Sequence, residues 1–265
     1  MITPGPLIAR YSDRLPGLAS MVAGLLVIVA IPLLLTTTSL RFAINQPRLY
    51  EYGFDKYNIS ERVGIDRDEL TSIAGEIRDY FNSDQEFIDI RATIFGQEKD
   101  LFTRREIVHM RDVKGLVQGV YLLQWITLGY VLAYGIVYLL WLGRAALPLL
   151  ARRLLWGGGL TLGVLVVLGL ASLVGFDSLF LKFHQLGFSN DFWRLDPRVH
   201  NLIAMFPQDF FLVATLLVAV LTIGQALLLV AVAGGYLWRR RRGRVRRRGE
   251  VEEEATLLES TASLP

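Results

Sequence analysis

The stretch that decides the fold reads, at residues 101–142, LFTRREIVHMRDVKGLVQGVYLLQWITLGYVLAYGIVYLLWL. Its first fourteen residues carry four basic side chains, two acidic side chains and a histidine, whereas the rest carries no charge. Thr103 and Glu106 have the spacing of a helix capping box, and no helix-breaking residue follows before Gly115. We therefore predict one long helix that begins outside a membrane and continues into a spanning segment.

Four apolar runs in the chain are long enough to cross a bilayer, whose hydrocarbon core of roughly 30 Å requires about 20 helical residues. Hydrophobic residues make up 52% of the chain, and they cluster in these runs. The first run is long for a signal peptide and lacks a small-residue cleavage site after it, so we expect an uncleaved anchor. The predicted spans are residues 18–38, 116–142, 154–176 and 210–238.

The distribution of arginine predicts the orientation of these spans. Basic residues concentrate in the segments 1–17, 143–153 and 239–265, and the last of these holds eight arginines between Arg239 and Arg248. Positively charged flanks stay in the cytoplasm, so both termini are expected inside. The arginine-rich tail is expected to contact anionic lipid rather than nucleic acid, and its acidic and Ser/Thr-rich end to be partly disordered.

Two longer connections, residues 39–115 and 177–209, are then expected outside the membrane. In the first, residues 63–81 have helical periodicity, residues 87–95 alternate as a strand does, and the aromatic stretch 50–57 suits an interface segment or another strand. The second is rich in Phe and Trp and suits an interfacial or re-entrant segment. The predicted fold is an all-α membrane protein with four transmembrane helices, a small α/β extracellular cap and a second, membrane-embedded outer loop.

The three histidines of the chain, His109, His184 and His200, all fall in the two outer segments. On the predicted helix, Glu106, His109 and Asp112 are spaced by three and share one face, so a carboxylate there can orient the imidazole. The alternative for this face is a solvated charged turn that anchors the helix at the membrane surface.

The residues argue against several kinds of chemistry. The chain has no cysteine, no HExxH zinc motif, and no second copy to complete Glu106-x-x-His109 as a di-iron motif, so we expect no metal. It has no GxSxG serine nucleophile. The spans contain almost no ionisable residue, which argues against a channel or transporter. Acid/base catalysis by histidine on a lipid-borne substrate remains.

Two motifs carry a resemblance to a known family. The stretch at residues 101–114, followed by a span, and FHQLGFSNDFWRLDP at residues 183–197 with NLIAMFP at residues 201–207, followed by the last span, resemble the integral membrane family of lipoprotein intramolecular transacylases, Lit. The resemblance covers roughly Leu101 to Phe210 and the first span, and the basic tail lies outside it.

The resemblance implies an enzyme of the bacterial cytoplasmic membrane whose active site faces the outer leaflet. It implies transfer of the sn-2 acyl chain from the diacylglyceryl group of a lipoprotein's N-terminal cysteine to the α-amine of that cysteine. By motif position, His109 and His184 are the catalytic pair, and His200 has no assigned role. The reaction needs no cofactor. The expected substrate is a diacylated lipoprotein or another lipid. Membrane phospholipid is expected to surround the protein, and the protein is expected to be a monomer.

From the residues themselves we expect His109 to act as the base, oriented by Glu106 or Asp112, with His184 as its partner; the two roles can also be exchanged. Lys114 or Asn190 is a candidate to support the oxyanion. An aromatic group is expected to bind substrate and exclude water: Phe183, Phe188 and Trp193. Two alternatives stay open, a related acyltransferase or esterase that uses the same histidines, and a membrane scaffold without catalysis.

Overall fold

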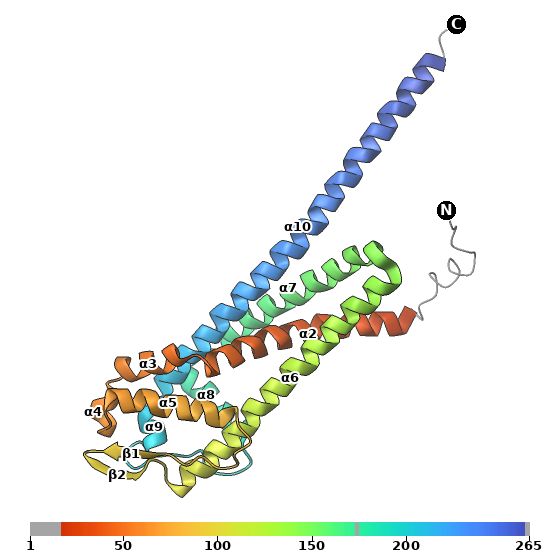
Figure 1. The fold of residues 1–265 in the computed structure, drawn as a ribbon. Helices are drawn as coiled ribbons and strands as arrows, with labels where there is room; N and C mark the ends of the chain where they lie inside the picture. The colour runs from red at the N-terminus through yellow and green to blue at the C-terminus, as the bar shows by residue number, and fades with distance from the viewer. Residues whose placement is uncertain (1–16, 173–174, 263–265) are drawn as a thin grey trace. The chain divides into compact units, whose positions relative to one another are not determined.

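The computed structural model describes residues 17–172 and 175–262, and Figure 1 shows the arrangement of the elements. Long helices dominate, and the described residues include one small sheet of two strands. The long helices are α2 (Gly17–Ile44), α6 (Arg104–Leu142), α7 (Leu147–Ser172) and α10 (Gln208–Ala262). The shorter elements are α3 (Pro47–Lys56), α4 (Ile59–Val63), α5 (Arg67–Phe81), β1 (Arg91–Ile94), β2 (Gln97–Asp100), η1 (Gly143–Ala146), α8 (Phe176–Gly187) and α9 (Asn201–Met205).

The chain divides into two compact units. Among the described residues, the span unit consists of residues 17–32, Tyr130–Leu162 and residues 225–262. The cap unit consists of Leu33–Gly129 and Gly163–Gly224, and it contains both histidine-bearing motifs.

Close contacts between glycine and larger side chains hold the span unit together. Gly157 of α7 faces Ile31 of α2, where an added Cβ would lie 2.3 Å from the Ile31 Cδ1 atom. Gly158 faces Val230 of α10, with a corresponding distance of 2.8 Å. Between α6 and α7 the short η1 begins at Gly143, whose φ of 54° favours glycine, and the chain turns back (Figure 1). Small residues thus allow the helix backbones to approach closely, as they do in membrane proteins.

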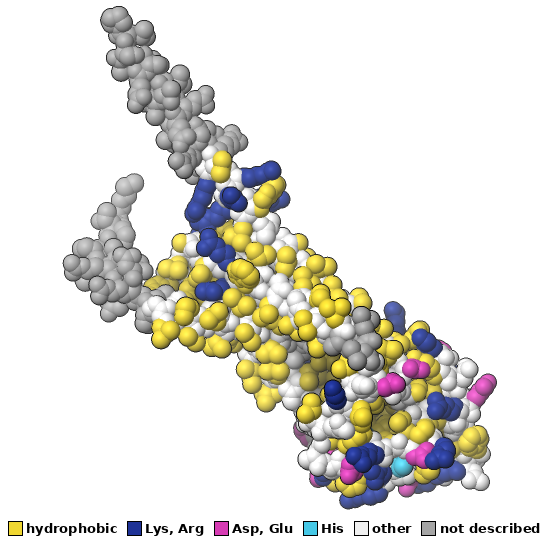
Figure 2. All heavy atoms as spheres, turned by 180° about the vertical axis from the view of Figure 1, so that it is seen from behind, with side chains coloured by type: hydrophobic (Ala, Val, Ile, Leu, Met, Phe, Trp, Pro, Cys, Tyr) yellow, Lys and Arg dark blue, Asp and Glu magenta, His cyan; other side chains and the backbone are white. Residues whose placement is uncertain are grey.

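Three continuous helical stretches of the described chain are long and apolar enough to cross a membrane: Gly17–Ile44, Arg104–Leu170 and Gln208–Val245. The second stretch contains both α6 and α7, because η1 joins them without a gap in the helical conformation. Many large apolar side chains on these helices are exposed, for example Leu140 at 83%, and Figure 2 shows hydrophobic side chains gathered on the long helices. Such surfaces are expected to contact lipid.

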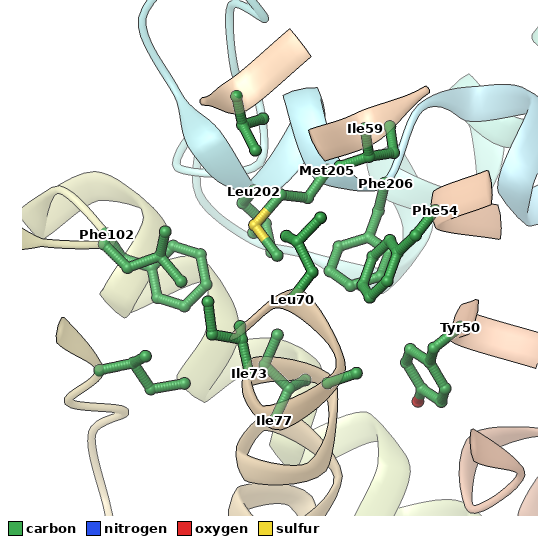
Figure 3. Close-up of a cluster of buried hydrophobic side chains, with 14 of the residues drawn as sticks. Tyr50, Phe54, Ile59, Leu70, Ile73, Ile77, Phe102, Leu202, Met205 and Phe206 are labelled. Carbon is green, nitrogen blue, oxygen red and sulfur yellow. The ribbon is translucent and has the colours of Figure 1, made fainter. Parts of the chain in front are cut away.

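The core of the cap unit is built around α5, close to the predicted helix at residues 63–81. Asp66 caps the helix by accepting a hydrogen bond of 2.9 Å from the Asp68 backbone N–H. Its buried face packs against aromatic and aliphatic side chains from α3 and α9 (Figure 3). The labelled members of this cluster are Tyr50, Phe54, Ile59, Leu70, Ile73, Ile77, Phe102, Leu202, Met205 and Phe206.

Two local predictions for the cap are changed by the structure. The strand alternative for residues 50–57 is wrong, because Tyr50 and Phe54 lie one helical turn apart on α3 and both face the core. The strand predicted at residues 87–95 is shorter, as β1, and pairs in antiparallel register with β2. Phe95 and Gly96 connect them with positive φ, at 49° and 78°, the backbone conformation of a tight hairpin turn.

The end of the chain also differs from its prediction. Where partial disorder was expected, α10 continues as helix through Ala262, and the last part of that prediction, at residues 263–265, lies outside the described residues. No proline occurs between Arg239 and Ala262, and Arg, Glu, Ala and Leu, all good helix formers, supply most of that segment.

Candidate active site

His109 lies in the first turns of α6, ahead of the apolar run that begins at Leu116. Its side chain is buried, with the residue 7% exposed. The ring meets Phe188 edge to face at a centroid distance of 5.1 Å. Its Nδ1 atom is buried and has no hydrogen-bond partner among the described residues. The imidazole is therefore held by packing rather than by a carboxylate.

His184 is oriented by its own helix. Its Nδ1 atom lies 2.8 Å from the backbone oxygen of Phe180, one turn earlier on α8. A carbonyl oxygen can only accept, so Nδ1 of His184 carries the proton and donates it. The Nε2 atom of a neutral ring then keeps its lone pair, which is the state that a general base requires.

The structure brings the two predicted catalytic histidines together from α6 and α8. Their ring centroids are 6.2 Å apart and the ring planes are inclined by 33°. At this separation, two imidazoles can contact different atoms of one bound ester group. Phe188 lies against both rings, at 5.1 Å from that of His109 and 5.5 Å from that of His184.

Aromatic side chains surround His184. Phe183 and Trp193 each lie with their ring centroids 5.3 Å from the imidazole, so all three predicted substrate-binding residues contact the histidine pair. Phe180 lies closer, at 4.3 Å, and was missed by the sequence reasoning. Its position four residues before His184 on an aromatic-rich helix is the signal that could have identified it.

Burial determines the charge state of His109. The pKa of this histidine is lowered to about 4, first by burial and then by the charge of His184, while the Asp112 carboxylate acts in the opposite direction. Burial disfavours the charged form of an imidazole. His109 is therefore neutral at neutral pH.

This lowered pKa predicts that the protein loses stability as the pH falls from about 6.5 to about 4. In the unfolded chain His109 takes up a proton near pH 6.5, but in the folded protein only near pH 4. The unfolded state binds more protons in this window. Lowering the pH across it therefore lowers the free energy of unfolding, by on the order of 3 kcal/mol. Thermal unfolding of wild type and His109→Gln at pH 7 and pH 5 measures the effect.

The His109→Gln variant should lose less of its unfolding temperature between these two pH values than wild type does. His200→Gln serves as the matched control and should keep the wild-type pH dependence. If the unfolding temperature of wild type and of His109→Gln changed equally between the two pH values, the burial of His109 would have no effect on the pH dependence of stability.

Glu106 does not orient His109, and that part of the prediction was wrong. Its Oε2 atom accepts hydrogen bonds of 2.7 Å from both the backbone N–H and the hydroxyl of Thr103. Its Oε1 atom accepts a bond of 2.7 Å from the backbone N–H of Leu202 in α9. Both oxygens of this fully buried carboxylate are thus occupied. Glu106 completes the predicted capping box and ties the start of α6 to α9.

Asp112 and Asn190 connect α6 with the loop that follows α8. The Asn190 amide donates a hydrogen bond of 2.7 Å to Oδ2 of Asp112. Arg105 makes a second connection, in which its Nε donates to the backbone oxygen of Arg194 at 3.2 Å and its Nη2 donates to that of Asp191. These bonds hold the loop, and with it His184, beside His109. Asn190 is therefore placed as a positioning residue.

Two other polar residues lie away from the pair. Lys114, predicted as a possible oxyanion partner, donates to Ser83 Oγ at 3.3 Å and lies 4.3 Å above the ring of Tyr80. Its amine is thus directed toward the loop after α5. His200 accepts a hydrogen bond of 3.0 Å at Nδ1 from the backbone N–H of Asp196, within its own turn. Among residues 17–172 and 175–262, no three His, Asp or Glu side chains are grouped to hold a metal ion.

The sequence matches a family model described as lipoprotein intramolecular transacylase Lit over residues 25–211. The chain belongs to the Lit family. The match to Lit includes His109, His184 and the loop that Asn190 and Arg105 hold. The resemblance drawn from the two outer motifs is confirmed, and with it membership in a family of acyltransferases.

Known proteins similar to this Lit-family chain include an uncharacterized protein of Aquifex aeolicus strain VF5. It is 25% identical over 199 residues, which are 75% of this chain and 87% of that protein. A solved structure of the membrane-integral lipoprotein intramolecular transacylase Lit from Bacillus cereus is similar with a TM-score of 0.70 and 23% identity. The likeness covers 85% of this chain and 99% of that one.

A variant of the Bacillus cereus protein with a single histidine-to-arginine substitution is also similar, with a TM-score of 0.68 and 23% identity over 88% of this chain and 98% of that one. These likenesses show a shared fold, that of a membrane-integral protein. They agree with the apolar helical stretches of this chain.

Proposed function

We propose that this protein converts diacylated lipoproteins to the lyso form. An acyl chain moves from the sn-2 ester of the diacylglyceryl group on the N-terminal cysteine to the α-amine of the same cysteine. The observation that carries this proposal is the pair of histidines, His109 and His184, with ring centroids 6.2 Å apart and with aromatic rings packed against them. Family membership supports the same reaction.

His184 acts as the base. Its Nδ1–H is bound to the Phe180 carbonyl, so Nε2 is free to accept a proton. An α-amine has a pKa of about 8, which leaves a neutral fraction able to attack at neutral pH. As the new C–N bond forms at the ester carbon, His184 takes the proton from nitrogen. It then gives this proton to the glyceryl oxygen as the C–O bond breaks, so one amide and one hydroxyl result.

His109 supports the oxyanion as a neutral donor. Its pKa of about 4 keeps it uncharged and makes it a weak base. Its buried Nδ1 has no partner among the described residues, so the proton of the neutral ring is assigned to Nε2. From there it can be donated to the developing negative charge, in a site that needs no reorganisation. The roles are thus exchanged relative to the expectation that His109 is the base.

With substrate bound, the aromatic rings beside the histidine pair limit access of water. Phe183, Phe188 and Trp193 bind the acyl and glyceryl parts of the substrate, and exclusion of water favours the amine as nucleophile. Apolar side chains of α8 are open for acyl chains, including Phe183 at 56% and Leu186 at 89% exposure. Donor and acceptor belong to one molecule, and an ester is exchanged for a more stable amide. The reaction therefore requires no acyl carrier and no energy source.

In this proposal the chain crosses the bacterial cytoplasmic membrane four times, near residues 18–38, 116–142, 154–176 and 210–238. Both termini are cytoplasmic, the histidine pair lies at the outer leaflet, and the protein acts as a monomer. The turn at η1, after which α7 runs back from the end of α6 (Figure 1), supports separate second and third spans. The arginines that flank the apolar helices support this orientation.

Mass spectrometry of lipoprotein N-terminal peptides tests the proposal. Cells that express this chain should yield N-acyl-S-monoacylglyceryl peptides, and cells without it should yield diacylglyceryl peptides with a free amine. Monoacylglyceryl peptides with a free amine, accompanied by free fatty acid, would identify an esterase instead. Unchanged diacylglyceryl peptides from cells that contain well-folded protein would exclude lipoproteins as substrate.

A further inference from the structure

The span unit holds an arginine that the catalytic site does not use. Arg153 of α7 lies against Gly24 of α2, which is buried, and an added Cβ at Gly24 would lie 2.4 Å from Nη2 of Arg153. Its Nε atom is buried and has no hydrogen-bond partner among the described residues. No ion pair among residues 17–172 and 175–262 includes Arg153. The guanidinium is therefore a cation without a described carboxylate partner.

The hydroxyl of Tyr134, from α6, lies beside this guanidinium. Tyr134 is 7% exposed, and its hydroxyl is buried without a hydrogen-bond partner among the described residues. Tyr134 interacts with both Tyr138 and Arg153, at a geometry that falls short of a normal hydrogen bond. Its ring stacks on Tyr138 at 4.5 Å, and the hydroxyl of Tyr138 is 3.0 Å from Ser20 Oγ. We call Ser20, Gly24, Tyr134, Tyr138 and Arg153 the Arg153 cluster.

The Arg153 cluster lies near the start of α2 and near the ends of α6 and α7 that adjoin η1. At 1.5 Å per residue, its members are about 5–12 Å along the helix axes from the start of α2, the end of α6 and the start of α7. This distance suits the head-group and ester region of a bilayer. Arg144 and Arg152, both exposed, belong to the same short stretch of chain.

We propose that the Arg153 cluster binds the phosphate group of an anionic phospholipid in the cytoplasmic leaflet. The choice of leaflet rests on the proposed topology. A guanidinium in apolar surroundings is costly unless an anion accompanies it. Its planar set of N–H donors matches phosphate oxygens, and the hydroxyl of Tyr134 beside it can donate to the same group. Basic pockets between spanning helices on the cytoplasmic side bind lipid head groups in this way.

Thermal unfolding of the full-length protein in detergent tests the binding of this lipid. Phosphatidylglycerol should raise the unfolding temperature of wild type by a few degrees, because a ligand that binds only the folded state stabilises it. Diacylglycerol with the same acyl chains, which lacks the phosphate, should not. Inorganic phosphate should also have no effect; an equal rise with inorganic phosphate would overturn the assignment to a lipid.

Variants locate the effect. Arg153→Gln should lose most of the rise caused by phosphatidylglycerol, and Tyr134→Phe should weaken it. Arg152→Gln, one residue away and exposed, is the matched control and should keep the full rise. If Arg153→Gln does not fold, native mass spectrometry of Tyr134→Phe should find less copurified phosphatidylglycerol than in wild type.

A full rise in Arg153→Gln, or unchanged copurified lipid in Tyr134→Phe, would overturn the proposal. Neither measurement depends on acyl transfer, so this result and that for the proposed function are separable.

Discussion

Replacement of His184 by glutamine is expected to lower the rate of acyl transfer about 10²- to 10⁴-fold, the range that general acid–base catalysis supplies. Glutamine has a similar length and can still donate to the Phe180 carbonyl, but its amide cannot take up a proton near neutral pH. The loss should therefore appear in the rate of the chemical step, while thermal unfolding stays close to that of wild type.

A comparison at His109 separates the two histidine roles. His109→Ala removes the proposed oxyanion donor and is expected to lower the rate about 10²- to 10³-fold. His109→Gln keeps an N–H donor and should retain more activity than His109→Ala. At position 184, the glutamine and alanine variants should have equally low activity, because a base is required there and glutamine is not one.

The rate of N-acyl product formation, measured by mass spectrometry with a synthetic diacylated lipopeptide, gives these values. His200→Gln is the control with wild-type activity, because the hydrogen bond at Nδ1 of His200 lies within its own turn. Near-normal rates in His184→Gln, or equal benefit of glutamine at both positions, would contradict the proposed division of roles.

Replacement of Glu106 by alanine is expected to lower the free energy of unfolding by about 2–5 kcal/mol. The change would leave the backbone N–H groups of Thr103 and Leu202 without their acceptor. A shift of this size lowers the unfolding temperature by on the order of 10 °C in a protein of this length. Thermal unfolding in detergent measures it directly.

The control for Glu106→Ala is Glu98→Ala, which removes an exposed carboxylate from β2. Glu98 pairs only with Arg91, at 3.3 Å, among the described residues, and both side chains are largely exposed. Such a pair contributes about 0–1 kcal/mol. An equal effect of both replacements would mean that the bonds of Glu106 to Thr103 and Leu202 add little stability.

The long helix at the centre of the fold could be predicted from local sequence. Thr103 and Glu106 indicated the start of α6, and the uninterrupted apolar run after Gly115 indicated its continuation. The bonds between Thr103 and Glu106 confirm the capping box. These predictions succeeded because they depend on residues only a few positions apart.

The site required distant contacts that spacing does not contain. No pattern in the sequence brings His109 near His184, and only the resemblance to the family paired them. Glu106 suited both the capping box and an imidazole partner equally well at a spacing of three. Glu106 takes the capping role because the backbone N–H of Leu202, in α9, also donates to its carboxylate. The position of the Lys114 amine likewise depends on a distant contact, its hydrogen bond to Ser83 in the loop after α5.

The hydrogen bond from His184 to Phe180 lies entirely within α8, a helix in which no residue is fully buried. The group that fixes the proton on Nδ1 therefore travels with the ring. A rigid displacement of α8 away from His109 and back would leave the Nδ1–H tautomer of His184 in place. A bulky substrate with two acyl chains can thus enter through a movement of α8 that leaves the hydrogen bond between His184 and Phe180 intact.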